Sequence, residues 1–150
     1  MGSFNRQKKI RKLVMNQNPI GYDYDTDEAL KIAQTLHHLE LDNCELGETG
    51  GTALGQAIIL SFKSKLQLKY LSVRNNYLAD KAAVRIAAGL EAGGTKLQVL
   101  NLAGNGINDS GGEVLARAMK NNNTVQEFDL SHNNLRFTTA AAFLESLKFN

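Results

Sequence analysis

One pattern of apolar residues occurs four times in this chain. The pattern is Leu-x-x-Leu-x-Leu-x-x-Asn/Cys-x-Leu, with related apolar residues allowed, and it begins at Leu36, Leu68, Leu97 and Val125. After each copy, apolar or small residues recur at every fourth position, which is the spacing of one helix face. Repetition at a nearly constant interval indicates units that stack side by side and share one core. The sequence therefore predicts an α/β fold of about four strand–turn–helix units.

Within each copy, the alternating apolar residues predict a short strand with one buried face. The turn that follows would bury backbone groups between units, and buried polar groups need hydrogen-bond partners. Asparagine offers both a carbonyl and an amide, so the turn residues Asn76, Asn105 and Asn133 are expected to form a ladder along the stack. Cys44 holds the same position in the first unit and is expected to be a buried structural thiol. As the only cysteine, it excludes an internal disulfide and suggests a reducing compartment.

The pattern resembles the leucine-rich repeat family, in the long variant found in ribonuclease inhibitor, tropomodulin, NOD-like receptors and the Ran GTPase-activating protein. The resemblance implies a right-handed solenoid over residues 36–150, with a parallel concave sheet and helices on the convex side. Residues 23–35 are expected to form a capping helix. The family binds many unrelated proteins on one scaffold, so the resemblance implies protein binding without naming a partner.

Residues 1–22 contain no acidic residue, whereas the rest of the chain has more acidic than basic residues. This segment is expected to be a basic N-terminal extension, either an amphipathic helix or a flexible arm. It could contact an acidic surface such as tubulin, RNA, an anionic membrane or an acidic protein groove, or remain a solvated tail. A mitochondrial presequence is a further reading. The residues that carry the charge are Arg6, Lys8, Lys9, Arg11 and Lys12.

The polar residues between the apolar strand positions should project from the concave face of the sheet. They are mildly acidic as a group, which suggests a docking surface for a protein segment that carries lysine or arginine. Tyr77, in the turn after Asn76, is the best candidate for an aromatic anchor. The expected surface comprises Glu40, Asp42, Ser72, Arg74, Tyr77, Asn101, Asp129 and Ser131.

The last helical segment ends in apolar residues, and no polar capping unit follows it in the sequence given. A terminal unit that exposes its apolar edge needs a cover. We therefore expect this edge to pack against another protein, unless the chain belongs to a longer array of repeats. The edge residues are Phe137, Phe143, Leu147 and Phe149.

Motifs for catalysis are lacking in this sequence. Its three histidines, His37, His38 and His132, have no cysteine or histidine at a metal-ligand spacing, and no cofactor motif stands out. No apolar run is long enough to cross a membrane. The chain is therefore expected not to be an enzyme and to bind neither a cofactor nor a small-molecule substrate.

The favoured function is an intracellular scaffold or structural subunit of a larger assembly, in a cytoplasmic or ciliary and cytoskeletal setting. This setting rests on the resemblance alone. The alternatives are a small-GTPase regulator of the Ran GTPase-activating type, which would use Arg74 and Asn75, an RNA-associated subunit, and a mitochondrial complex subunit.

Overall fold

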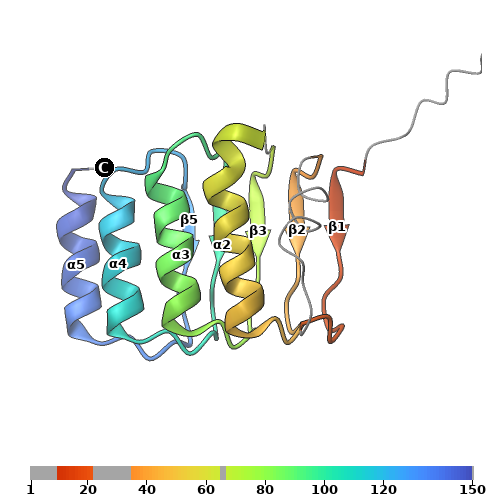
Figure 1. The fold of residues 1–150 in the computed structure, drawn as a ribbon. Helices are drawn as coiled ribbons and strands as arrows, with labels where there is room; N and C mark the ends of the chain where they lie inside the picture. Colours follow the sequence, from red (N-terminus) through yellow and green to blue (C-terminus); the bar gives the residue numbers. More distant parts are fainter. Residues whose placement is uncertain (1–9, 22–34, 65–66, 150) are drawn as a thin grey trace, which may run out of the picture.

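A computed structural model describes residues 10–21, 35–64 and 67–149, with only the backbone described for 61–64. Five short strands form one parallel sheet in chain order (Figure 1). They are β1 (Lys12–Val14), β2 (His38–Glu40), β3 (Tyr70–Ser72), β4 (Val99–Asn101) and β5 (Glu127–Asp129). The described helices are α2 (Gly47–Ser64), α3 (Ala79–Glu91), α4 (Asp109–Met119) and α5 (Phe137–Leu147). The predicted α/β fold of stacked strand–turn–helix units is confirmed.

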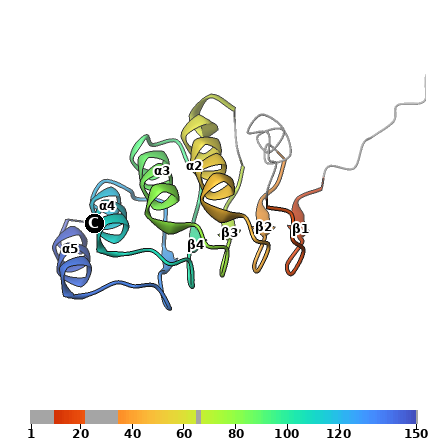
Figure 2. The ribbon, with the colours of Figure 1, turned by 60° about the horizontal axis from the view of Figure 1, so that its bottom comes forward.

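The helices lie in one layer on one side of the sheet, as Figure 2 shows. Helix α2 contacts α3, α3 contacts α4 and α4 contacts α5, while none of the four contacts a helix further along the stack. We call the opposite side of the sheet the open face. The core lies between the two layers.

The strand register explains why the apolar pattern repeats. Leu13, Leu39, Leu71, Leu100 and Phe128 are aligned across the five strands, each beside the next. The central members are almost inaccessible to solvent, whereas Leu13 and Phe128 at the two ends are half-buried. Equivalent residues therefore form a continuous apolar row that is driest in the middle of the stack.

A ladder of turn residues connects neighbouring units. Asn76 Oδ1 accepts the N–H of Cys44 at 2.9 Å, and its amide donates to the carbonyl of Leu41 at 2.7 Å. Asn105 Oδ1 accepts the N–H of Asn76, and Asn133 Oδ1 accepts that of Asn105, both at 2.9 Å. Each asparagine thus satisfies backbone groups of the unit before it.

Cys44 is fully buried at the same position of the ladder. Its thiol lies 3.1 Å from the carbonyl of Met15, in the unit formed by β1. The smaller side chain therefore still points toward the preceding turn, although it has no amide to donate.

The expectation of a helix or flexible arm is wrong at Lys12–Val14, which forms strand β1 and pairs with β2. Within the described residues the sheet therefore has five strands, one more than the four predicted units supply. The sequence contains a fifth copy of the pattern, made by Ile10, Leu13, Met15, Asn18 and Ile20, which is interspersed with basic residues. Arg11 and Lys12 are exposed in this unit.

Two further predictions fall largely or wholly on residues that the structure does not describe. Arg6, Lys8 and Lys9 lie in the segment 1–9, and the expected capping helix over 23–35 lies outside the described residues except for Thr35. Both stay predictions.

Candidate binding surfaces

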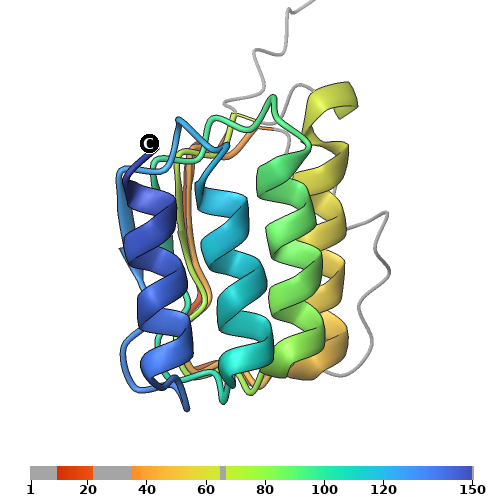
Figure 3. The same ribbon diagram turned by 90° about the vertical axis from the view of Figure 1, so that its left-hand side faces the viewer.

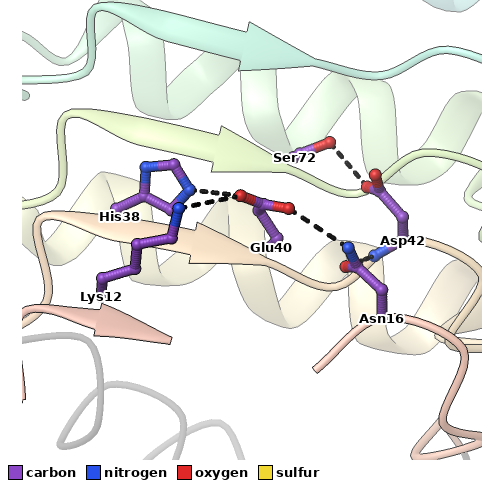
Figure 4. A network of polar contacts seen from close by, with 6 residues as sticks. All are labelled: Lys12, Asn16, His38, Glu40, Asp42 and Ser72. Carbon is purple, nitrogen blue, oxygen red and sulfur yellow. Dashed lines mark hydrogen bonds and ion pairs between the residues drawn. The ribbon is translucent and has the colours of Figure 1, made fainter. Parts of the chain in front are cut away.

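The N-terminal half of the open face carries a connected group of polar side chains, drawn in Figure 4. Glu40 projects from β2 and lies at the centre. Its Oε1 is 3.6 Å from Lys12 Nζ on β1 and 2.5 Å from Nε2 of His38, and its Oε2 accepts the amide of Asn16 at 3.2 Å. His38 also stacks on Tyr70 of β3, with 4.0 Å between ring centroids. This part of the face is therefore held by contacts among three neighbouring strands.

Asp42 is engaged in the same way. Its Oδ1 accepts the hydroxyl of Ser72 at 2.6 Å and the N–H of Arg74 at 2.8 Å. Ser72 was expected on the partner surface, but it is only 2% exposed. It is buried because it packs within the sheet and donates to Asp42, so it supports this carboxylate and offers no contact to a partner.

The C-terminal half of the open face is more accessible. Asp129 and Ser131 are exposed, and Asp129 Oδ1 accepts the N–H of Ser131 at 2.9 Å. Arg74 is also exposed, while Asn101 is half-buried and accepts the N–H of Ala103 at 2.9 Å. The structure therefore divides the predicted surface into an internally bonded half and an accessible half.

Tyr77 lies apart from both halves. It is 75% exposed in the turn before α3, with a left-handed φ of 57°. It is not aligned with the strand positions that carry the other residues of the predicted surface. Its exposed ring is a separate feature at the turn edge of the sheet.

The electrostatics of the open face favour carboxylates at neutral pH. The hydrogen bond from His38 is the largest cause that holds the pKa of Glu40 below its ordinary value of 4.5, with smaller contributions from Asn16 and Lys12. The N–H of Ser131 likewise lowers the pKa of Asp129. The surface can therefore accept lysine or arginine side chains. Across the described residues, no group of three or more side chains is arranged to hold a metal ion.

The lowered pKa of Glu40 predicts a pH-dependent loss of stability in Glu40→Gln. Above pH 4.5 the carboxylate is ionised in both the folded and the unfolded protein. Its hydrogen bonds and ion pair then contribute fully to the free energy of unfolding, by about 1 kcal/mol. As the pH falls below 4.5 toward the lower pKa of the folded protein, this contribution is lost. Urea unfolding should therefore show the variant less stable than the parent at pH 7, with a difference that shrinks as the pH falls below 4.5. The control is Glu91→Gln, because Glu91 is exposed. A stability difference for Glu40→Gln that persists unchanged in acid, or that Glu91→Gln reproduces, would contradict the role given to Glu40.

The C-terminal end of the stack is apolar. Figure 3 views the molecule from this end, where α5 has no further described helix beside it. Four large apolar side chains stand in solvent, with exposed fractions of 82% for Phe137, 68% for Leu144, 59% for Leu147 and 62% for Phe149. Lys120 Nζ lies 4.6 Å from the centre of the Phe149 ring.

Beside these residues lies a groove of about 610 Å³ between α5 and β5. Phe143 is half-buried there and meets Phe128 edge to face, with ring centroids 5.9 Å apart. The groove reaches Phe128, the last residue of the apolar row, and its lining is mostly apolar. Its lining residues are Met119, Asn123, Val125, Gln126, Phe128, Leu130, Phe143 and Leu147.

Sequence reasoning missed several residues that the structure brings onto these surfaces. Asn16, His38 and Tyr70 complete the network around Glu40, and Glu127 is exposed on β5 beside the C-terminal end. The fifth copy of the pattern could have revealed Asn16 as an outward residue. The alternation in the known units could have revealed the other three.

The repeated turns, the aligned leucines and the asparagine ladder indicate a stack of similar units. The sequence matches the leucine-rich repeat family over residues 33–55, 95–116 and 121–136. These three segments carry leucine-rich repeats. Such repeats generally serve as protein-interaction modules and not as enzymes. A comparison with curated proteins gave no significant match. In the described part of the chain, no helix has the length and apolar character needed to span a membrane.

Proposed function

We propose that this leucine-rich repeat chain is a non-catalytic scaffold or structural subunit that binds another protein through its C-terminal end. The supporting observation is the exposure of Phe137, Leu144, Leu147 and Phe149 beside the open groove. Contiguous apolar surface on a folded protein commonly marks an interaction site. Covering one such side chain fully would contribute about 1.5–3 kcal/mol to association. The accessible part of the open face, with Asp129 and Arg74, is a second polar contact area in this proposal.

Covalent capture would test the proposal. A photoreactive amino acid is placed at Leu144 on the C-terminal end or, as a control, at Val84, which is 44% exposed on α3. After irradiation of cells that express the protein, we expect the Leu144 variant to give a discrete adduct with another protein and the Val84 variant to give none. The absence of an adduct at Leu144, or the same adducts from both positions, would contradict the proposal.

The finer features of the proposal rest on resemblance. The last units begin at intervals of 29 and 28 residues, which supports the ribonuclease-inhibitor-like subfamily. We further propose an intracellular setting in a larger assembly, with a ciliary or cytoskeletal complex favoured. RNA-associated and mitochondrial roles would depend on the basic residues near the N-terminus.

The Ran GTPase-activating alternative would use Arg74 and Asn75. Arg74 is exposed and could reach a partner, but the amide of Asn75 donates to Asn43 Oδ1 at 3.1 Å. This bond gives Asn75 a role within the stack, which favours the scaffold over the regulator.

A further inference from the structure

We propose that the C-terminal end receives an extended segment of a partner protein, in which apolar and basic residues alternate. The segment would add to the sheet beside β5, with its apolar side chains in the groove and its basic side chains toward Glu127 and Asp129. This inference rests on the proposed function, and it specifies the chemical kind of partner. Four features of the end carry it.

First, the helix layer at this end is not built to meet another repeat. Gly55 of α2, Ala87 of α3 and Ala116 of α4 hold equivalent positions in the repeat, nine residues after the last apolar residue of the pattern, and all three are buried. Space is so tight at Gly55 that a Cβ atom would lie 2.7 Å from the backbone carbon of Arg85 on the next helix. The equivalent residue of α5 is Leu144. A further helix at the same spacing would collide with its side chain.

Second, α5 lacks the acceptor that joins the helix starts of inner units. Asp80 accepts the N–H of Asn108 at 2.7 Å and the hydroxyl of Ser110 at 2.6 Å, both in the next unit. Asp109 accepts the N–H of Arg136 at 2.8 Å in the same manner. The equivalent residue in the last unit is Phe137, which cannot accept a hydrogen bond. Two of the helix positions that meet a following unit therefore carry, in α5, a larger side chain and a side chain that cannot accept a hydrogen bond.

Third, the strand side retains the groups that meet a following unit. Leu41, Val73 and Leu102 donate their N–H groups to the next strand's unit at 2.9, 3.1 and 2.8 Å. Leu130 is their counterpart in the last unit, and β5 is the edge strand of the described sheet. An exposed strand edge is a template for the addition of another strand. The end can thus extend its sheet but not its helix layer, which favours a single extended segment.

Fourth, the chemistry of the end selects the side chains of that segment. Successive residues of a strand point to opposite faces, so one set would enter the apolar groove and the other would lie on the open face. On that face the segment would meet Glu127 and Asp129, both exposed. The same pairing already occurs at the other end of the sheet, where Lys12 on β1 lies 3.6 Å from Glu40 on β2.

A second copy of the chain fits this edge poorly. If two β5 strands paired in antiparallel fashion about Phe128, Glu127 of each copy would face Asp129 of the other. Like charges directly opposite one another destabilise a strand pair. A basic partner segment removes this repulsion.

The test uses fluorescence anisotropy of the whole chain with a labelled, end-capped peptide of about nine residues in which valine and lysine alternate. We expect this peptide to bind. Three altered peptides should bind at least about tenfold more weakly: one with scrambled order, one with glutamate for lysine, and one with alternate backbone amides N-methylated. N-methylation blocks strand pairing and leaves the protein unchanged, so it isolates the backbone contribution.

Matched protein variants locate the site. Glu127→Lys with Asp129→Lys should weaken binding by at least about tenfold. Glu45→Lys with Glu91→Lys, at exposed positions away from this end, makes the same change in net charge and should leave affinity within about twofold. Circular dichroism of both variants confirms that they are folded.

Several outcomes would overturn the inference. They are no binding at roughly 1 mM peptide, equal binding of the N-methylated peptide, or tighter binding of a helix-forming peptide of the same composition. Sedimentation that shows a dimer abolished by Leu144→Asp would identify a second copy as the occupant instead. If Leu144 still gives an adduct with a protein while the peptide fails, only this inference falls. If the adduct is absent too, the proposed function falls with it.

Discussion

Replacing Asn105 with alanine is expected to lower the free energy of unfolding by about 3 kcal/mol. Asn105 is 1% exposed, and its amide donates to the carbonyls of Val73 at 3.0 Å and Leu102 at 2.9 Å. Its Oδ1 accepts the N–H of Asn76. Alanine would leave the carbonyl of Val73 and the N–H of Asn76 without this partner, and each such buried group costs about 1–3 kcal/mol. The carbonyl of Leu102 would keep the amide of Asn133, which donates to it at 3.0 Å. Partial relaxation and entry of water should keep the total near the lower end of the sum.

Urea unfolding followed by circular dichroism measures this effect. Asn121→Ala is the control, because Asn121 is exposed at the end of α4 and should change stability by no more than about 0.5 kcal/mol. A loss below about 1 kcal/mol for Asn105→Ala would show that the ladder contributes little to stability.

Replacing Gly55 with leucine is expected to lower the free energy of unfolding by about 2 kcal/mol. A helix gains about 1 kcal/mol when glycine is replaced by a good helix former. The added side chain, however, would press on the backbone of α3, since even a Cβ atom would lie 2.7 Å from the carbon of Arg85. Forcing these helices apart also opens the apolar contact between them. The steric cost should therefore outweigh the gain in helix propensity.

Leu144→Ala is the matched experiment at the equivalent position of the last helix. Its side chain is 68% exposed, so we expect a change within about 0.5 kcal/mol. Thermal or urea unfolding of the two variants side by side would compare an inner with a terminal position. If Leu144→Ala costs as much as Gly55→Leu, then Leu144 packs within the chain and is not part of a binding end.

The α/β stack could be predicted because its determinants are local and repeated. One copy of the pattern is ambiguous, but four copies place Leu39, Leu71 and Leu100 in register without further information. The first unit escaped prediction since its pattern uses isoleucine and methionine and is mixed with Arg11 and Lys12. The density of positive charge there suggested a solvent-exposed arm. In the structure Lys12 is exposed on β1 while the next residue, Leu13, packs against the core, so both signals are compatible.

The candidate surfaces were less predictable. The exposure of Phe137 and Phe149 follows from the position of the last helix, where no described unit covers it. Ser72 donates to a carboxylate 30 residues away, that of Asp42 in the turn after the neighbouring strand β2. Cross-strand pairs of this kind arise from the angle and twist of the sheet, which the repeat pattern does not encode. Sequence reasoning therefore identified some of the outward positions but not which of them already form hydrogen bonds within the chain.

The helices contact one another only in chain order, and this has a consequence for local unfolding of the molecule. Because α2, α3, α4 and α5 each contact only their immediate neighbours, a unit can detach from an end without disturbing the middle. Amide protons of α3 and β3 should thus exchange with deuterium most slowly, and those of α5 and β1 fastest. A partner bound at α5 would suppress this fraying from one side only, so protection would spread inward from the bound end and fade with distance along the stack.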